Sequence, residues 1–454
     1  MARDGASRGN RCEVAADALD DTGFGVGSNG DERVHVADLL PGERAEVAID
    51  HRSRQQPAAW GRVVRRLGAP SPDRVEPPCP GFGRCGGCAW QHLAYPAQLI
   101  AKRDRVIAAL GRTDVAEVRP SPAIVGYRNK GKYVVGRGSG QLVLGAYAPR
   151  THTVVDTLGC KVVAPIIDEV ASWVRGAAES AELIAYDEAT RAGELRYVIV
   201  REVGGDVLIA LIVASATPRA KLEHVANAMA RHPAVRGLVA IDNDRRDGAI
   251  VPSGSPAAKI LFGHGYIVDD LAGAPIEIGV GEFVQVNRAQ ARALYARVVE
   301  LADVAPGDAA VDLYAGLGGI GLHLARAGAR VLAVEQDGDA VAALRRAAER
   351  ANLPVTAIVA DAAALPAAEL GSPTVVVVNP PRKGLSPAAR ELVVAVAPRT
   401  IIYVSCGPEA LGRDLALLAK AGYTADAIEP FDLMPGTSQV EVLVRLRREV
   451  APER

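Results

Sequence analysis

The chain has 454 residues, a formal net charge of −1, 49% hydrophobic residues and 23% charged residues. This length corresponds to roughly two to four domains, and the composition excludes a largely disordered chain. No stretch approaches the ~18 consecutive apolar residues of a membrane span, and residues 1–10 lack the apolar core of a secretory signal, so we expect a cytoplasmic protein without a membrane partner.

Residues 11–75 predict a small β-barrel. Short apolar runs at 34–36, 45–49 and 60–64 are separated by turns that contain glycine and proline. Short strands with such turns are typical of small barrels that bind oligonucleotides, although any small β domain has the same pattern. A proline-rich hinge at 70–80 ends this module.

Three cysteines, Cys79, Cys85 and Cys88, lie within ten positions at the end of this hinge. An all-cysteine metal site needs a fourth thiolate, and apart from Cys12 the only candidate nearby is Cys160. Zinc and a [4Fe–4S] cluster both accept four thiolates. Because the trio lacks the paired spacing of zinc ribbons, we favour the iron–sulfur cluster and keep zinc as the alternative.

Residues 76–284 predict a second domain of the α+β class that carries the cysteine site. A helix is expected at 95–110, where it can pack on the following domain, and strands are expected within 124–160 and 195–270.

The charges are distributed unevenly along the chain. Residues 51–150 contain 17 Lys and Arg against five Asp and Glu, a net charge of +12, so the rest of the chain carries −13. Such a local excess predicts a surface for a polyanion, with a solvated basic face as the alternative.

From about residue 285 the pattern changes to alternating helices and strands. This alternation predicts a doubly wound, Rossmann-like α/β domain over 285–454. The expected helix covers 287–304, and the expected strands cover 309–313, 331–335, 356–359, 375–378 and 400–404.

A glycine-rich turn that includes Gly316 and Gly318 follows the first of these strands. Glycines let the backbone approach a ligand at a helix N-terminus, and Glu335, at the end of the next strand, can bind a ribose diol. The spacing alone fits both NAD and S-adenosylmethionine. The flanking Asp312 and Tyr314 favour S-adenosylmethionine.

Three further candidates stand near predicted strands. Asn379 begins an Asn-Pro-Pro motif after a strand, which is typical of enzymes that methylate amino groups. Cys406 precedes an expected helix, whose N-terminus would lower the thiol pKa and favour a nucleophile, although a cysteine ending a buried strand is often inert. Glu441 lies in an expected strand at 439–446, where a carboxylate usually faces solvent.

Taken together, these motifs resemble the RNA (uracil-5-)-methyltransferases, specifically the iron–sulfur branch with an N-terminal TRAM domain that acts on 23S ribosomal RNA. The resemblance spans about residues 11–446. It implies a TRAM RNA-binding barrel, carrying the family's turn at residues 40–43. It also implies four cluster ligands, Cys79, Cys85, Cys88 and Cys160.

The same resemblance implies roles for the C-terminal residues. Gln285, Tyr314 and Glu335 match residues that contact the methyl donor, Cys406 matches the nucleophile, and Glu441 matches the base. The chain departs from the family at four positions. Asn379 replaces the usual Asp, which the resemblance implies contacts the methyl donor or the target base. Gly319 and Gly407 each replace an Asn, and Gln439 replaces a His.

The expected reaction is methylation of uridine C5 in RNA by S-adenosylmethionine, through a covalent bond between Cys406 and uracil C6. We expect ribosomal RNA as the partner, with transfer RNA as a second choice, and a monomeric protein. The alternatives are an amino-group methyltransferase of the N6-adenine type, a catalytically weak RNA-binding protein, and an NAD oxidoreductase.

Overall fold

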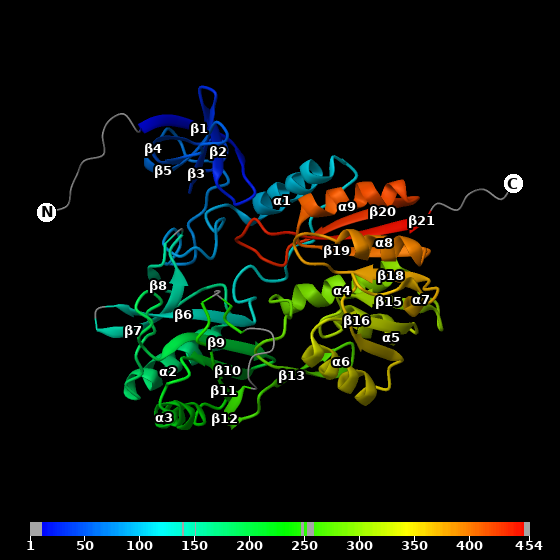
Figure 1. The fold of residues 1–454 in the computed structure, drawn as a ribbon. Helices are drawn as coiled ribbons and strands as arrows, with labels where there is room; N and C mark the ends of the chain where they lie inside the picture. Colours follow the sequence, from blue (N-terminus) through cyan, green and yellow to red (C-terminus); the bar gives the residue numbers. More distant parts are fainter. Residues whose placement is uncertain (1–10, 139, 150, 247–248, 252–257, 449–454) are drawn as a thin grey trace.

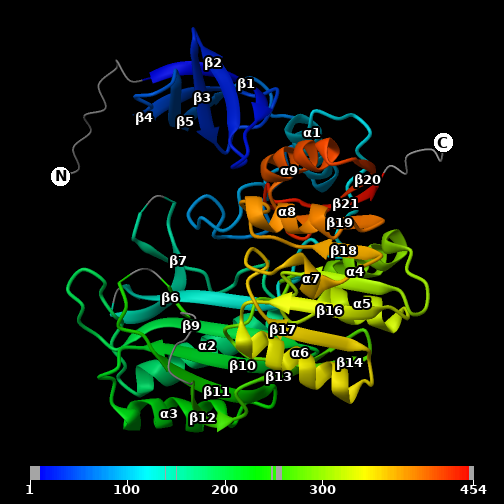
Figure 2. The ribbon, with the colours of Figure 1, turned by 45° about the vertical axis from the view of Figure 1, so that its right-hand side comes forward.

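The computed structural model describes residues 11–138, 140–149, 151–246, 249–251 and 258–448. These residues form a closed barrel, two seven-stranded sheets and a two-stranded hairpin. Figures 1 and 2 show the barrel above the central sheet, with the C-terminal sheet and its helices to one side.

The predicted N-terminal barrel is confirmed. Its strands close in the order β1-β2-β3-β5-β4. Alternating residues such as Val14, Val34 and Val47 are fully buried inside it. The strands are β1 (Arg11–Leu19), β2 (Gly25–Asn29), β3 (Glu32–Ala37), β4 (Arg44–Arg52) and β5 (Ala58–Leu67).

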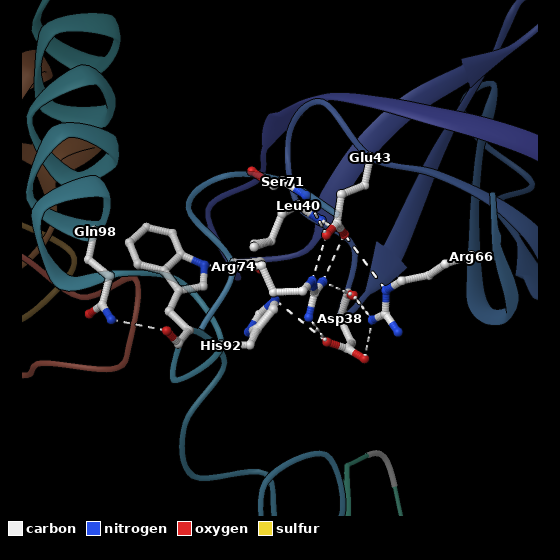
Figure 3. A network of polar contacts seen from close by, with 10 residues as sticks. Asp38, Leu40, Glu43, Arg66, Ser71, Arg74, His92 and Gln98 are labelled. Atoms are coloured by element: carbon white, nitrogen blue, oxygen red, sulfur yellow. Dashed lines mark hydrogen bonds and ion pairs between the residues drawn. The ribbon is translucent and has the colours of Figure 1, made fainter. Parts of the chain in front are cut away.

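A network of charged groups joins the barrel to the segment that follows it (Figure 3). Both carboxylate oxygens of Glu43 accept hydrogen bonds from the Arg74 guanidinium, at 2.5 and 2.7 Å, and backbone N–H groups of Leu40 and Ser71 donate to the same carboxylate. Arg74 also pairs with Asp38. Burial opposes ionisation of Glu43, but these donors outweigh it and lower its pKa to about 2.

The central sheet carries two helices on one face and the C-terminal sheet's core on the other. Its order is β12-β11-β10-β9-β6-β7-β8. The helices α2 (Pro165–Ser180) and α3 (Arg219–Met229) share one hydrophobic core with one face of this sheet. The strands are β6 (Lys130–Gly138), β7 (Gln141–Tyr147), β8 (Val154–Asp156), β9 (Leu195–Val203), β10 (Asp206–Val213), β11 (Val235–Asp242) and β12 (Lys259–Gly263).

The opposite face of the central sheet is packed against residues of the C-terminal part. A single core joins Tyr197 and Ile199 of β9 to Leu317 and Leu344. The hairpin of β13 (Ile267–Leu271) and β14 (Ala274–Ile278) also contributes to this core.

The predicted Rossmann-like α/β domain is confirmed, with an antiparallel strand among the parallel ones. The sheet order is β17-β16-β15-β18-β19-β21-β20. The strands are β15 (Ala309–Leu313), β16 (Arg330–Glu335), β17 (Val355–Val359), β18 (Val375–Val378), β19 (Thr400–Ser405), β20 (Tyr423–Phe431) and β21 (Glu441–Arg448). The helices are α4 (Arg288–Ala302), α5 (Gly319–Arg326), α6 (Gly338–Arg350), α7 (Ala367–Leu370), α8 (Pro387–Ala395) and α9 (Pro408–Lys420).

Helix α1 (Tyr95–Leu110) lies early in the chain but packs against α9 of the C-terminal sheet (Figure 1). Its Arg105 donates to the Glu409 carboxylate at 3.1 Å and to the Ser438 carbonyl. Pro96 stands near the start of α1, and Gly111 ends the helix with a φ of 62°, so local sequence sets both ends. None of the helices in the described chain is long and apolar enough to cross a membrane.

Candidate active site

The ends of β18 and β19 meet the start of β21 at one edge of the C-terminal sheet. β18 and β19 are parallel, β21 runs antiparallel to β19, and Ser405 pairs with Val442. Cys406 follows Ser405 and Glu441 precedes Val442, so this register brings both side chains to the same edge. Open α/β sheets bind their ligands at the carboxyl ends of the parallel strands.

Cys406 lies between β19 and α9, as expected, but its environment differs from the sequence-based prediction. The helix N-terminus led us to expect a lowered thiol pKa. Instead, burial of Cys406 and the charge of the nearby Glu441 raise the pKa of the thiol, while the charge of Arg382, a backbone hydrogen bond and a hydrogen bond from Arg382 to the sulfur oppose the rise. The position before α9 therefore does not give the lowered thiol pKa that we expected, and the charge of Arg382 is the largest influence that favours the thiolate.

Glu441 is buried, contrary to what its place in an alternating strand indicates. Its exposed fraction is only 7%, and burial raises its pKa to about 7, with Arg382 opposing the rise. A carboxyl with this pKa exchanges protons readily at neutral pH, which suits a general base. The guanidinium of Arg382 donates to the Gln439 side-chain oxygen at 3.1 Å. Arg382 thus interacts with both the candidate nucleophile and the candidate base.

The glycine-rich turn joins β15 to α5 and meets the end of β16. The Gly316 N–H donates to Glu335 Oε2 at 2.9 Å, and the N–H groups of Gln336 and Asp337 donate to Oε1. These three amides orient the Glu335 carboxylate at the edge of the turn. Gly316 has a φ of 54°, and a Cβ placed there would meet no atom within 4 Å, so the space beside it is open to a ligand.

Two residues of this turn are under conformational constraint. Tyr314 has a φ of 63°, a left-handed conformation that is costly for a residue with a side chain and that clusters at functional sites. A Cβ on Gly318, which has a φ of 78°, would lie 2.3 Å from Leu344, so close packing of the turn on α6 requires glycine.

The buried carboxyl of Asp312 is hydrogen-bonded to the start of α5, directly after the turn. Its Oδ2 accepts the Gly321 N–H at 2.9 Å, and burial raises its pKa to about 7. Its Oδ1 is buried without a hydrogen-bond partner among the described residues. This carboxyl is therefore a structural support for the turn rather than a group exposed to substrate.

Within the described residues, neither the Asn379 side chain nor the Gln285 side chain is hydrogen-bonded to the turn. The Asn379 N–H donates to the Leu313 carbonyl at 3.3 Å, and its half-buried side chain has no partner among the described residues. The Gln285 carbonyl accepts from Asn129 Nδ2 at 3.2 Å. Val284, its neighbour, packs in the same core as Leu317 of the turn.

Tyr295 of α4 is a site residue that the sequence analysis missed. A Cβ at Gly319 would lie 2.9 Å from the Tyr295 ring and 3.0 Å from its hydroxyl, so this ring fills the space where the resembled family carries an asparagine side chain. Burial, and next the charges of Glu441 and Asp312, raise the pKa of the Tyr295 hydroxyl, so this hydroxyl stays protonated. A lone tyrosine in an amphipathic helix gives no sequence signal for this position.

The structure brings the four expected metal ligands, Cys79, Cys85, Cys88 and Cys160, around one cavity of about 110 Å³. Burial is the main cause that raises the pKa of Cys88 to about 12, and the charge of Cys160 is the next largest. Burial likewise raises the pKa of Cys85. A four-thiol set at one cavity fits a four-thiolate centre. However, no three His, Cys, Asp or Glu side chains of the described ranges are grouped so that they could hold a metal ion.

The basic stretch 51–150 is less cationic in the fold than in the sequence. More than half of its Lys and Arg residues form ion pairs, and almost all of their carboxylate partners lie outside the stretch. Arg105 with Glu409 and Arg119 with Glu429 are two examples. The surface that we expect to bind a polyanion must therefore be formed by the Lys and Arg residues of this stretch that have no carboxylate partner.

Known proteins match this chain along nearly its whole length. The family model described as tRNA (uracil-5-)-methyltransferase matches residues 369–449. An uncharacterized RNA methyltransferase of Halalkalibacterium halodurans is 32% identical over 444 residues, covering 94% of this chain and 95% of the relative. A similar protein of Caldanaerobacter subterraneus is 30% identical and covers 97% of this chain and 100% of the relative.

A solved structure matches the complete architecture. The Pyrococcus abyssi tRNA (uracil-54, C5)-methyltransferase in complex with S-adenosyl-L-homocysteine has a TM-score of 0.78 and 25% sequence identity, covering 96% of this chain and 99% of that chain. The residues matched by the family model include the strand that begins at Glu441. The chain therefore belongs to the RNA (uracil-5-)-methyltransferase family.

Proposed function

We propose that the protein transfers the methyl group of S-adenosylmethionine to C5 of a uridine in RNA, through a covalent bond between Cys406 and C6 of the base. The observation that carries this proposal is the meeting of Cys406 and Glu441 on neighbouring strand ends, with Arg382 beside both. An enzyme that methylates an amino group has no need for such a thiol.

The uracil C5 carbon is too weak a nucleophile to accept a methyl group unaided. Attack of the Cys406 thiolate on C6 forms a C–S bond and moves the electron pair of the C5–C6 double bond into an enolate. The enolate C5 then forms a bond to the methyl carbon, whose bond to the donor sulfur breaks and leaves S-adenosylhomocysteine. The Glu441 carboxylate removes the C5 proton, the C5–C6 double bond reforms, and Cys406 leaves as a thiolate.

We assign Arg382 and Asn379 to the stabilisation of negative charge during the reaction. Arg382 stabilises the Cys406 thiolate before attack, and the free amide of Asn379 can donate to the developing oxyanion at O4. Because an amide carries no charge, Asn379 supports binding through hydrogen bonds alone, unlike the aspartate usual at this position. Arg382→Ala with an unchanged methylation rate would remove Arg382 from this role.

The donor would be held by the turn after β15. Gly316 leaves open space at the turn, Glu335 presents an oriented carboxylate for a ribose, and Tyr314 lies in the turn itself. We assign Gln285 to the donor as well, because its neighbour Val284 packs in the same core as Leu317 of the turn. The similarity to a structure in complex with S-adenosyl-L-homocysteine supports this assignment.

Nucleoside mass spectrometry tests the reaction. Unmodified 23S ribosomal RNA and an unmodified tRNA transcript are incubated with methyl-deuterated S-adenosylmethionine and either wild type or Cys406→Ala. We expect label in 5-methyluridine with wild type and none with the variant. Ribosomal RNA is our first choice of substrate, and label confined to the tRNA would correct it. Label in an adenine amino group that persists in Cys406→Ala would overturn the proposal.

The adduct itself can be trapped. Glu441→Gln cannot remove the C5 proton, so elimination stops after methyl transfer and the RNA stays attached to Cys406. Denaturing gel electrophoresis should then show a protein–RNA complex for Glu441→Gln and none for Glu441→Gln combined with Cys406→Ala.

We also propose that Cys79, Cys85, Cys88 and Cys160 hold a [4Fe–4S] cluster, with zinc as the alternative. Their arrangement around one cavity supports a four-thiolate centre, and the spacing of the trio, which is not the paired spacing of zinc ribbons, favours the cluster. The centre would stabilise the buried thiolates, whose pKa values burial otherwise raises. Iron, sulfide and zinc analysis of anaerobically purified protein, with Cys88→Ser as control, distinguishes the two metals.

A further inference from the structure

Three cations lie on one face of the central sheet without a matching number of carboxylates, and this face shares its hydrophobic core with Leu317 of the glycine-rich turn. Lys130 of β6 pairs in register with Arg201 of β9, and Lys132 projects from the same face two residues later. We call these three residues the β6–β9 cation group. Their strand face is the one that shares its core with Leu317 of the glycine-rich turn, since Val134 and Ile199 belong to that core.

The segment that carries Gln285 is attached to this group. Lys130 Nζ donates to the Val280 carbonyl at 3.0 Å, and Arg201 Nη2 donates to the Glu282 carbonyl at 2.7 Å. The Asn129 N–H donates to the Val286 carbonyl at 2.9 Å. The cations therefore border the segment from 280 to 286, directly before α4.

The positive charge of the group is only partly compensated. Arg201 is 1% exposed, and its buried Nε has no hydrogen-bond partner among the described residues. Burial and then the charges of Arg201 and Lys132 lower the pKa of Lys130 to about 7, and Glu282 is the one carboxylate that opposes this shift. Because of this lowered pKa, Lys130 is only partly protonated at neutral pH, so the positive potential that favours a bound anion comes chiefly from Arg201 and Lys132, against the carboxylate of Glu282.

Lys132 is the most accessible member of the group. It is exposed, and within the described ranges it forms no ion pair. Most cations elsewhere in residues 51–150 are paired with carboxylates, as described above, so Lys132 and its neighbours are a place where the charge excess of the stretch remains available. A phosphate is the anion that an RNA brings to this position.

We propose that the β6–β9 cation group binds backbone phosphates of the RNA segment that carries the target uridine. This inference rests on the proposed function, because it takes RNA as the substrate. Lys132 contacts a phosphate directly, whereas Lys130 and Arg201 hold the 280–286 segment and add to the local potential. The group would thereby fix the position of the RNA strand relative to Cys406 without reading its sequence.

The test compares RNA affinity as a function of salt concentration. Wild type, Lys132→Gln, Lys132→Arg and Arg137→Gln are titrated against in vitro transcribed 23S ribosomal RNA and a tRNA transcript. Arg137 is a matched control, because it is an exposed cation on the same strand but on the opposite face. Affinity for S-adenosylhomocysteine, measured by calorimetry, checks that each variant retains its donor site.

For Lys132→Gln we expect roughly fivefold weaker RNA binding and a decrease of about one in the slope of log K against log salt. Lys132→Arg should restore both values, and Arg137→Gln should match wild type. Equal effects of Lys132→Gln and Arg137→Gln, or weaker binding with an unchanged salt slope, would overturn the inference. Absence of 5-methyluridine from wild-type reactions, with the Lys132 effect present, would overturn the proposed reaction alone.

Discussion

Lys102 of α1 and Asp432 form an ion pair of 2.6 Å in which both side chains are completely buried, although 330 residues separate them in the chain. Asp432 directly follows β20, and Lys102 Nζ also donates to the Met434 carbonyl at 3.1 Å. The pair therefore attaches an early helix to the segment that ends at Glu441. Gln98 strengthens this attachment by accepting the Gly436 N–H at 2.8 Å.

We predict that Lys102→Met destabilises the protein by about 3–5 kcal/mol, because it leaves Asp432 buried without its counter-charge. Lys102→Met combined with Asp432→Leu should recover a large part of this loss, since no buried charge remains. Urea denaturation of both variants measures the difference. A double variant less stable than Lys102→Met would contradict this explanation.

The rate of methylation should rise with pH through about 7. Burial raises the pKa of Glu441 to about 7, and only the ionised carboxylate, present above that pH, can remove the C5 proton. Burial also raises the pKa of the Cys406 thiol, so higher pH favours the nucleophile as well. Below about pH 7 both groups are protonated, so we expect roughly a hundredfold loss of kcat/KM per pH unit, easing to roughly tenfold per unit just above the Glu441 pKa, where the thiol alone still titrates. A flat profile between about pH 6 and 8 would exclude Glu441 as the base.

Glu441→Gln should make the protein more stable at alkaline pH. The folded-state pKa of about 7 lies above the ordinary 4.5, so the unfolded state loses its proton first, and wild-type stability falls as pH rises through this window. Above about pH 7 the variant should gain roughly 2–3 kcal/mol, and near pH 4 the two proteins should be equally stable. Thermal unfolding at both pH values provides the measurement.

Glu43 should have the opposite pH dependence. Its folded-state pKa of about 2 lies below the ordinary 4.5, so its contribution to stability is complete above about pH 4.5 and is lost as pH falls towards 2. Glu43→Gln should cost about 1–3 kcal/mol at pH 7, because Arg74 loses its charged partner. The cost should shrink in acid, and an equal cost near pH 2 would contradict the assignment.

Gly319→Ala should weaken binding of S-adenosylhomocysteine by moving the Tyr295 ring. The added Cβ would lie 2.9 Å from that ring, and such overpacking typically costs about 1–3 kcal/mol. Tyr295→Ala combined with Gly319→Ala removes the clash and should bind the ligand better than Gly319→Ala alone. Calorimetric titration compares the variants, and Gly338→Ala, where a Cβ meets nothing, is the control.

Several features of this protein were accessible from local sequence patterns. The alternating apolar residues predicted the barrel strands, and the expected helix at 95–110 has the bounds of α1. The expected helix at 287–304 is α4, with Asn287 as its cap rather than its first residue, because the Asn287 side chain accepts the Gln290 N–H. The expected strand at 439–446 starts at Glu441 because Gln439 and Val440 lie outside the ladder.

The sequence by itself determined the elements, the glycine-rich turn and the cysteine trio, because short-range periodicity and backbone preferences specify them. Only the tertiary structure decided which distant residues meet. The antiparallel register of β21 places Glu441 beside Cys406, and burial there raises both pKa values against the expectation from a helix N-terminus. Folding likewise paired several cations of residues 51–150 with carboxylates hundreds of positions away in the chain, which a local count of charges cannot show because ion pairing depends on distance in the fold.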